Sequence, residues 1–130
     1  MNKTLYAVVA VSVLLGFGAG PRQGPEVTSV MREKLEHTQK ILEAVVTDDW
    51  VGLEQHSREL ERLIQDPRWT ALRYPEYARH SGAFARSVQD LHRAAVQRDL
   101  EKTPKAYIEV TLTCVECHRY LARERIAERR

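Results

Sequence analysis

Four segments of this chain repeat apolar residues at steps of three and four, and no segment alternates apolar and polar residues as a half-buried strand would. Since a helical turn takes 3.6 residues, this spacing places the apolar side chains on one face of an amphipathic helix. The chain has 130 residues, which suits one domain with one modest core. The pattern therefore predicts an all-α fold.

The first two helices are delimited by residues that favour turns. The first stripe ends at Thr47-Asp48-Asp49, whose side chains prefer caps, and the second ends at Asp66-Pro67, because proline cannot continue a helix. The first stripe comprises Val27, Val30, Met31, Leu35, Thr38, Ile41, Leu42, Val45 and Val46, and the second Trp50, Leu53, Ser57, Leu60 and Ile64. The charged residues predicted to face solvent on the first helix are Arg32, Glu33, Lys34, Glu36 and Lys40.

Residues 66–75 form the longest predicted connection, with Trp69 and Leu72 tucked under the bundle. A third helix is expected from Pro75, and Thr103-Pro104 is the cap and first-turn proline of a fourth. Their inward residues are predicted to be Tyr77, Ser81, Phe84, Val88, Leu91 and Ala95, then Tyr107, Val110, Thr111, Cys114, His118 and Leu121. Short connections between four such helices favour an antiparallel up-down-up-down four-helix bundle, with a charged tail from residue 122 that frays.

Residues 1–20 have the layout of a secretory signal peptide: Lys3, an apolar run from Leu5 to Phe17, and small residues at the end. The run is shorter than the roughly 20 residues of a usual membrane span, but an uncleaved N-terminal anchor is the alternative. The folded domain, residues 21–130, is then expected to be periplasmic or otherwise exported. A membrane is a predicted partner only if the segment stays uncleaved.

The charge balance gives no support for nucleic-acid binding. Lys and Arg total 20 against 18 Asp and Glu, a formal net charge of +2, and no basic stretch carries interleaved aromatic residues for base stacking.

The two cysteines of the chain stand in Cys114-Val115-Glu116-Cys117-His118. A thioredoxin-type redox pair needs a helix N-terminus in a βαβ fold, and structural zinc needs a second ligand pair. The sequence predicts neither. The third use of C-x-x-C-H is covalent haem attachment, with a plain disulfide or a chance match as the alternatives. On a helix Cys114 and Cys117 are one turn apart, so both sulfurs can reach the two vinyl groups on one edge of a single haem c. His118 can then present its imidazole to the iron as proximal ligand.

With TCVECHRYLAR near its C-terminus and four predicted helices, the sequence resembles the class II c-type cytochromes, the cytochrome c-prime superfamily, over about residues 27–123. The resemblance implies that a residue on the first helix faces the iron opposite the proximal histidine. Met31 falls at that place, which corresponds to the low-spin, methionine-ligated type. An open sixth site and a histidine ligand remain the alternatives. His37 lies nearly two turns beyond Met31, and His56, His80 and His92 are predicted to be half-exposed surface residues.

The expected function is that of an exported monohaem electron carrier with transient redox partner proteins. The alternative is a high-spin cytochrome c-prime-like protein whose open distal site binds small gases. A third reading is an enzyme that uses haem for peroxide or nitrogen-oxide chemistry. It is not expected, because that chemistry needs a distal His or Arg as acid–base residue and Arg32 is predicted to point away from the stripe. A homodimer through the first two helices, as in many relatives, is possible. Further residues predicted to border the haem are Leu35, Tyr107, Val110, Thr111, Phe84, Val88 and Leu91.

Overall fold

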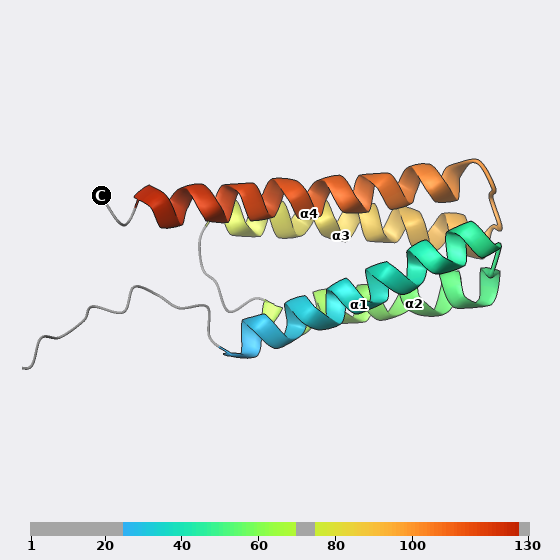
Figure 1. Ribbon diagram of the computed structural model, residues 1–130, viewed down its shortest axis with the longest axis horizontal. Helices are drawn as coiled ribbons and strands as arrows, with labels where there is room; N and C mark the ends of the chain where they lie inside the picture. The colour runs from blue at the N-terminus through green and yellow to red at the C-terminus, as the bar shows by residue number, and fades with distance from the viewer. Residues whose placement is uncertain (1–24, 70–74, 128–130) are drawn as a thin grey trace, which may run out of the picture.

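The structure, a computed structural model, describes residues 25–69 and 75–127. Its four helices are α1 (Pro25–Thr47), α2 (Trp50–Ile64), α3 (Pro75–Val96) and α4 (Lys102–Ala127), and the described ranges contain no strand. Each helix runs back along the one before it, so that the start of α1 and the later turns of α4 lie at the same end (Figure 1). The predicted all-α four-helix bundle is confirmed. The predicted leader, residues 1–20, and Leu72 lie outside the described residues.

Both tight turns of the bundle rely on an aspartate cap. Asp48 ends α1 with φ 54°, and the Asp49 side chain accepts a hydrogen bond from the Gly52 backbone N–H at 3.0 Å to begin α2. At the other turn Asp99 Oδ1 accepts from the Lys102 N–H at 2.9 Å. The fourth helix therefore begins at Lys102, slightly before the predicted Thr103-Pro104 start, because Asp99 provides the cap.

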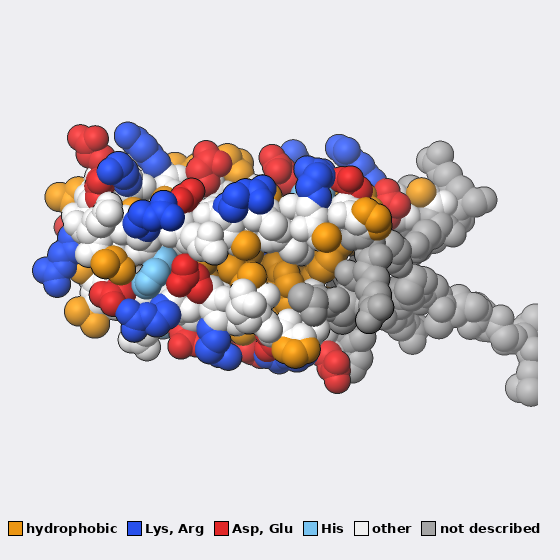
Figure 2. All heavy atoms as spheres, turned by 180° about the vertical axis from the view of Figure 1, so that it is seen from behind, with side chains coloured by type: hydrophobic (Ala, Val, Ile, Leu, Met, Phe, Trp, Pro, Cys, Tyr) orange, Lys and Arg blue, Asp and Glu red, His pale blue; other side chains and the backbone are white. Residues whose placement is uncertain are grey.

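The apolar core lies along the centre of the bundle. In Figure 2 charged side chains cover the outer surface of the α2–α3 side, and hydrophobic side chains gather in the seam between the two helices. Helices α1 and α2, α2 and α3, and α3 and α4 pack along their lengths, whereas α1 and α4 make few contacts. The core comprises Val30, Ile41, Ala44, Leu53, Leu60, Leu63, Trp69, Phe84, Val88, Leu91, Ala95 and Val110.

Part of the apolar stripe predicted on α1 is exposed, because α1 and α4 make few contacts. Leu35, Leu42 and Val46 belong to the predicted stripe, yet they are 57%, 46% and 72% exposed. The stripe is wide enough to face two neighbours, and only the side toward α2 is closely packed. The prediction that these three side chains are inward was therefore wrong.

Arg68 connects the segment after α2 to α1. Its guanidinium donates to Glu33 Oε1 at 2.8 Å, Ser29 Oγ at 2.9 Å and Asp66 Oδ2 at 2.6 Å. These bonds hold the following Trp69, which is buried as predicted. Glu33 was predicted to be simply solvated; it is instead the α1 side of this connection.

The end of α4 also differs from the sequence expectation. The charged segment predicted to fray from residue 122 stays helical through Ala127, and residues 128–130 lie outside the described ranges. Among the described helices, none combines the length and apolar character needed to cross a membrane.

Candidate functional site

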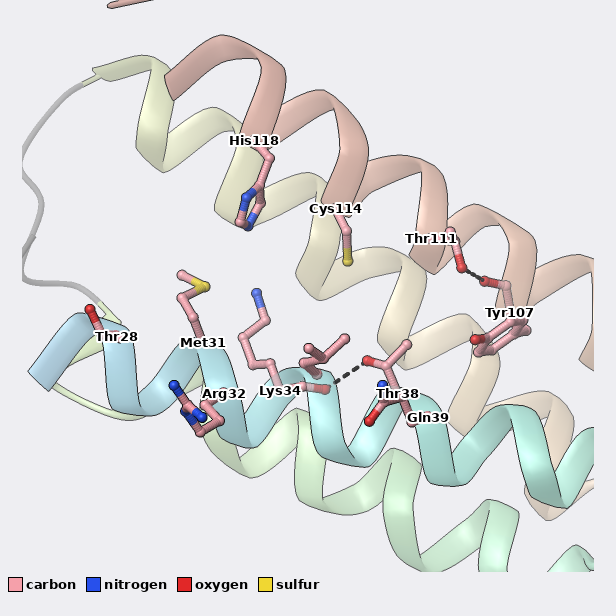
Figure 3. A pocket seen from close by; sticks show the side chains of 11 residues that line it. Thr28, Met31, Arg32, Lys34, Thr38, Gln39, Tyr107, Thr111, Cys114 and His118 are labelled. Carbon is pink, nitrogen blue, oxygen red and sulfur yellow. Dashed lines mark hydrogen bonds between the residues drawn. The ribbon is translucent and has the colours of Figure 1, made fainter. Parts of the chain in front are cut away.

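A cavity of about 590 Å³ opens between α1 and α4, where the two helices make few contacts. Its volume lies within the range of small-molecule and cofactor pockets. His118 projects from α4 and Met31 from α1, and their side chains point toward one another across the cavity (Figure 3). The residues that line it are Thr28, Met31, Arg32, Lys34, Leu35, Thr38, Gln39, Tyr107, Thr111, Cys114 and His118.

Helix α4 presents Cys114 and His118 to the same cavity because positions four apart lie on one helical face. Cys117 borders a second, deeper cavity of about 40 Å³, whose walls also include Cys114 and His118. Both thiols are free and half-buried. The structure thus brings the three residues of the C-x-x-C-H motif to one region, where Cys114 borders both cavities and Cys117 the deeper one.

Met31 is half-buried and packs against the apolar core. It borders both cavities, as do Lys34, Cys114 and His118. Arg32, the adjoining residue, is exposed and borders the outer cavity but not the deeper one.

Lys34 was predicted to face solvent, and that prediction was wrong. Its Nζ lies 3.3 Å from the centre of the Trp69 ring and 3.8 Å from that of Phe84. Figure 3 shows the side chain reaching from α1 toward α4 between Met31 and Cys114. Burial lowers the pKa of Lys34 to about 7, although the nearby Cys114 and Cys117 oppose this shift. The signal was available, because Lys34 follows Met31 by three residues and so shares its face.

Burial and the charge of Lys34 also shift the pKa values of the two thiols. Burial raises the pKa of Cys114 and of Cys117, and the positive charge of Lys34 partly opposes the rise in both. The apolar walls of the site thus favour the neutral thiols and disfavour a charged amine.

The histidines outside the motif occupy two kinds of position. His80, predicted to be half-exposed, is only 6% exposed; it borders the deeper cavity and its ring lies 5.2 Å from that of Tyr120. The other three are partly buried, and none borders either cavity. His37 and His56 approach each other with their Nδ1 atoms 3.1 Å apart, and His92 Nδ1 lies 2.8 Å from Ser57 Oγ.

The remaining predicted lining residues divide between cavity and core. Leu35, Tyr107 and Thr111 border the outer cavity and Phe84 the deeper one, whereas Val88, Leu91 and Val110 are fully buried in the core. No group of three or more His, Cys, Asp or Glu side chains suited to hold a metal ion occurs within the described ranges.

Comparison with models of known protein families, with curated proteins and with solved structures finds no match. The resemblance to class II cytochromes therefore remains a prediction from the motif and the helix order.

Proposed function

We propose that this protein is a monohaem c-type cytochrome that carries electrons outside the cytoplasm. One observation carries the proposal: His118 and Met31 face each other across a cavity that also receives the Cys114 sulfur. An imidazole and a thioether are a common axial pair for a c-type haem. The donor set fits this cofactor, because both thiols are free and the imidazole stands one residue beyond Cys117.

Each residue has a distinct proposed role. Cys114 and Cys117 would hold the haem through two thioether bonds to its vinyl groups, and addition of each S–H to a vinyl group would need no oxidant. His118 and Met31 would bind the iron from opposite helices. When bound, the haem iron supplies one-electron exchange, and a thioether ligand favours its reduced state.

The surroundings suit electron transfer more than catalysis. Tyr107, Leu35 and Phe84 contribute apolar or aromatic surface to the walls of the cavities. Arg32 is exposed and borders the outer cavity but not the deeper one, and we assign it no acid–base role. We therefore propose a carrier with transient redox partner proteins and no enzymatic activity of its own.

Export follows from the nature of the proposed cofactor and from residues 1–20. Haem c is joined to polypeptides outside the cytoplasm, and this segment has the layout of a signal peptide. We propose a periplasmic or otherwise exported location, with pairing of two copies through the first two helices as a further possibility. N-terminal sequencing of the mature chain checks the cleavage.

The test of the proposed function is an absorption spectrum of the haem-matured protein, oxidised and then reduced, before and after carbon monoxide. We expect sharp low-spin bands in both states, a weak far-red sulfur-to-iron band in the oxidised state, and slow or absent CO binding. Broad high-spin bands with immediate CO binding in the unmodified protein would instead support the open-site, gas-binding alternative.

Covalent attachment needs a separate test. Haem should remain on the chain after denaturation and acid extraction. The double substitution Cys114→Ser and Cys117→Ser should abolish that retention, and each single substitution should leave one thioether. Retention of haem by the double variant would disprove the proposed attachment.

A further inference from the structure

The proposed axial pair leaves the most unusual side chain of the site without a role. Lys34 extends into the region between α1 and α4 and ends against two aromatic rings. Among the described residues it forms no ion pair, in contrast to Lys40 and Lys102, whose amines pair with nearby carboxylates. Removing an amine from water without a carboxylate partner is costly, so its place in the cavity calls for a functional explanation.

The position of Lys34 is fixed by the helix. It follows Met31 by three residues, so both side chains leave the same face of α1 one turn apart. Both border the outer cavity and the deeper one, together with His118. Figure 3 shows the amine and the Met31 sulfur on the same side of the site, opposite the imidazole.

Two roles for such an amine can be compared. A lysine could neutralise the haem carboxylates, but those lie on the edge of the macrocycle away from the vinyl groups. Lys34 borders the deeper cavity together with Cys114 and Cys117, which mark the vinyl edge. The other role is that of a nitrogen ligand, and metal binding itself displaces the proton that a ligand amine carries.

We propose that Lys34, through Nζ, is a second distal ligand that competes with Met31 for the sixth position of the iron; this inference rests on the proposed haem function. Two donors one turn apart keep that position filled whenever one of them leaves. The consequence is a distal side that stays closed to small gases, as an electron carrier requires.

The experiment compares haem-matured wild type with Met31→Ala, Lys34→Ala and the double variant, by electron paramagnetic resonance and absorption of the oxidised protein. We expect Met31→Ala to lose the sulfur-to-iron band yet stay low-spin, with the signature of a nitrogen ligand. The double variant should become high-spin, and its apparent affinity for CO should exceed that of Met31→Ala by on the order of tenfold or more, because the open fraction rises.

Lys34→Arg in the Met31→Ala background is the matched control, since a guanidinium keeps the charge but does not ligate. It should resemble the double alanine variant. The inference is wrong if Met31→Ala alone is high-spin, or if the arginine variant stays low-spin. Circular dichroism of each variant verifies the helices, and Lys34→Leu, which fills the space but offers no donor atom, replaces Lys34→Ala if the latter does not fold.

Failure of the Lys34 ligand and failure of the haem function give different results. If denatured wild type retains no haem, the proposed function and the role of Lys34 both fail. If haem is retained and the Met31→Ala spectra do not depend on residue 34, only the Lys34 ligand is disproved.

Discussion

The two long sides of the bundle differ although all four helices are amphipathic. Along α2 and α3 the apolar faces meet directly, and Leu60, Leu63 and Leu91 are fully buried. Between α1 and α4 the helices make few contacts, and a cavity takes the place of packed side chains.

The difference shows that an apolar face does not by itself specify a closed interface. On the α2–α3 side, leucine and valine fill the space between the helices. On the α1–α4 side the facing residues include Lys34 and His118, whose polar ends are costly to bury without hydrogen-bond or charge partners. A bundle can therefore reserve one of its four seams for a ligand while the other three supply stability.

The largest expected effect is on the free energy of unfolding, and it compares a leucine on the α2–α3 side with one on the α1–α4 side. Leu60→Ala should lower the free energy of unfolding by about 2–5 kcal/mol, because the side chain is fully buried and leaves a cavity. Leu35→Ala in the haem-free chain should cost only about 0.5 kcal/mol, because that side chain is 57% exposed. Urea denaturation measures both. Equal losses would show that the α1–α4 side is packed after all.

Lys34→Met should stabilise the haem-free chain, by about 1–3 kcal/mol at pH 6, because it removes a buried amine. Burial lowers the pKa of Lys34 from 10.5 to about 7. Between these values the unfolded chain binds more protons at this group, so Lys34 should make wild-type stability rise as pH increases from about 7. Above about 9 the raised pKa values of Cys114 and Cys117 oppose this rise, equally in wild type and in Lys34→Met, because the folded chain then retains the thiol protons longer. Denaturation across this range should show the rise in wild type and not in Lys34→Met. Lys40→Met, at an exposed lysine paired with Glu43, is the control and should leave the rise intact.

The smallest expected effect concerns the His37–His56 pair that joins α1 and α2. Burial, then the charges of His37 and Lys40, lower the pKa of His56, whereas Asp49 and Glu36 oppose the shift. The unfolded chain thus binds more protons as pH falls below the ordinary value of 6.5, and stability should decline there. His56→Asn should weaken this decline by a few tenths of a kcal/mol, because the imidazole is only partly buried. An unchanged pH profile of denaturation would contradict the predicted role of the pair.

Much of the fold could be predicted from local sequence. Asp66-Pro67 separates α2 from the connection to α3, and Pro75 begins α3, because proline restricts the backbone wherever it stands. Trp69 could be predicted as buried from its size and apolar character. The burial of His80 could not, since its place near Tyr120 depends on how α3 and α4 meet.

The same distinction between sequence and tertiary structure applies to the candidate site. The sequence by itself determined the order of four amphipathic helices and the spacing of Cys114, Cys117 and His118, because helical periodicity and turn residues act over a few positions. The sequence also placed Lys34 on the same helical face as Met31. Only the tertiary structure decided that α1 and α4 stay apart and that this face of α1 lies opposite His118 across a cavity. The physical reason is that the width of an apolar stripe does not reveal which neighbour covers each part of it; the packing of the whole bundle does.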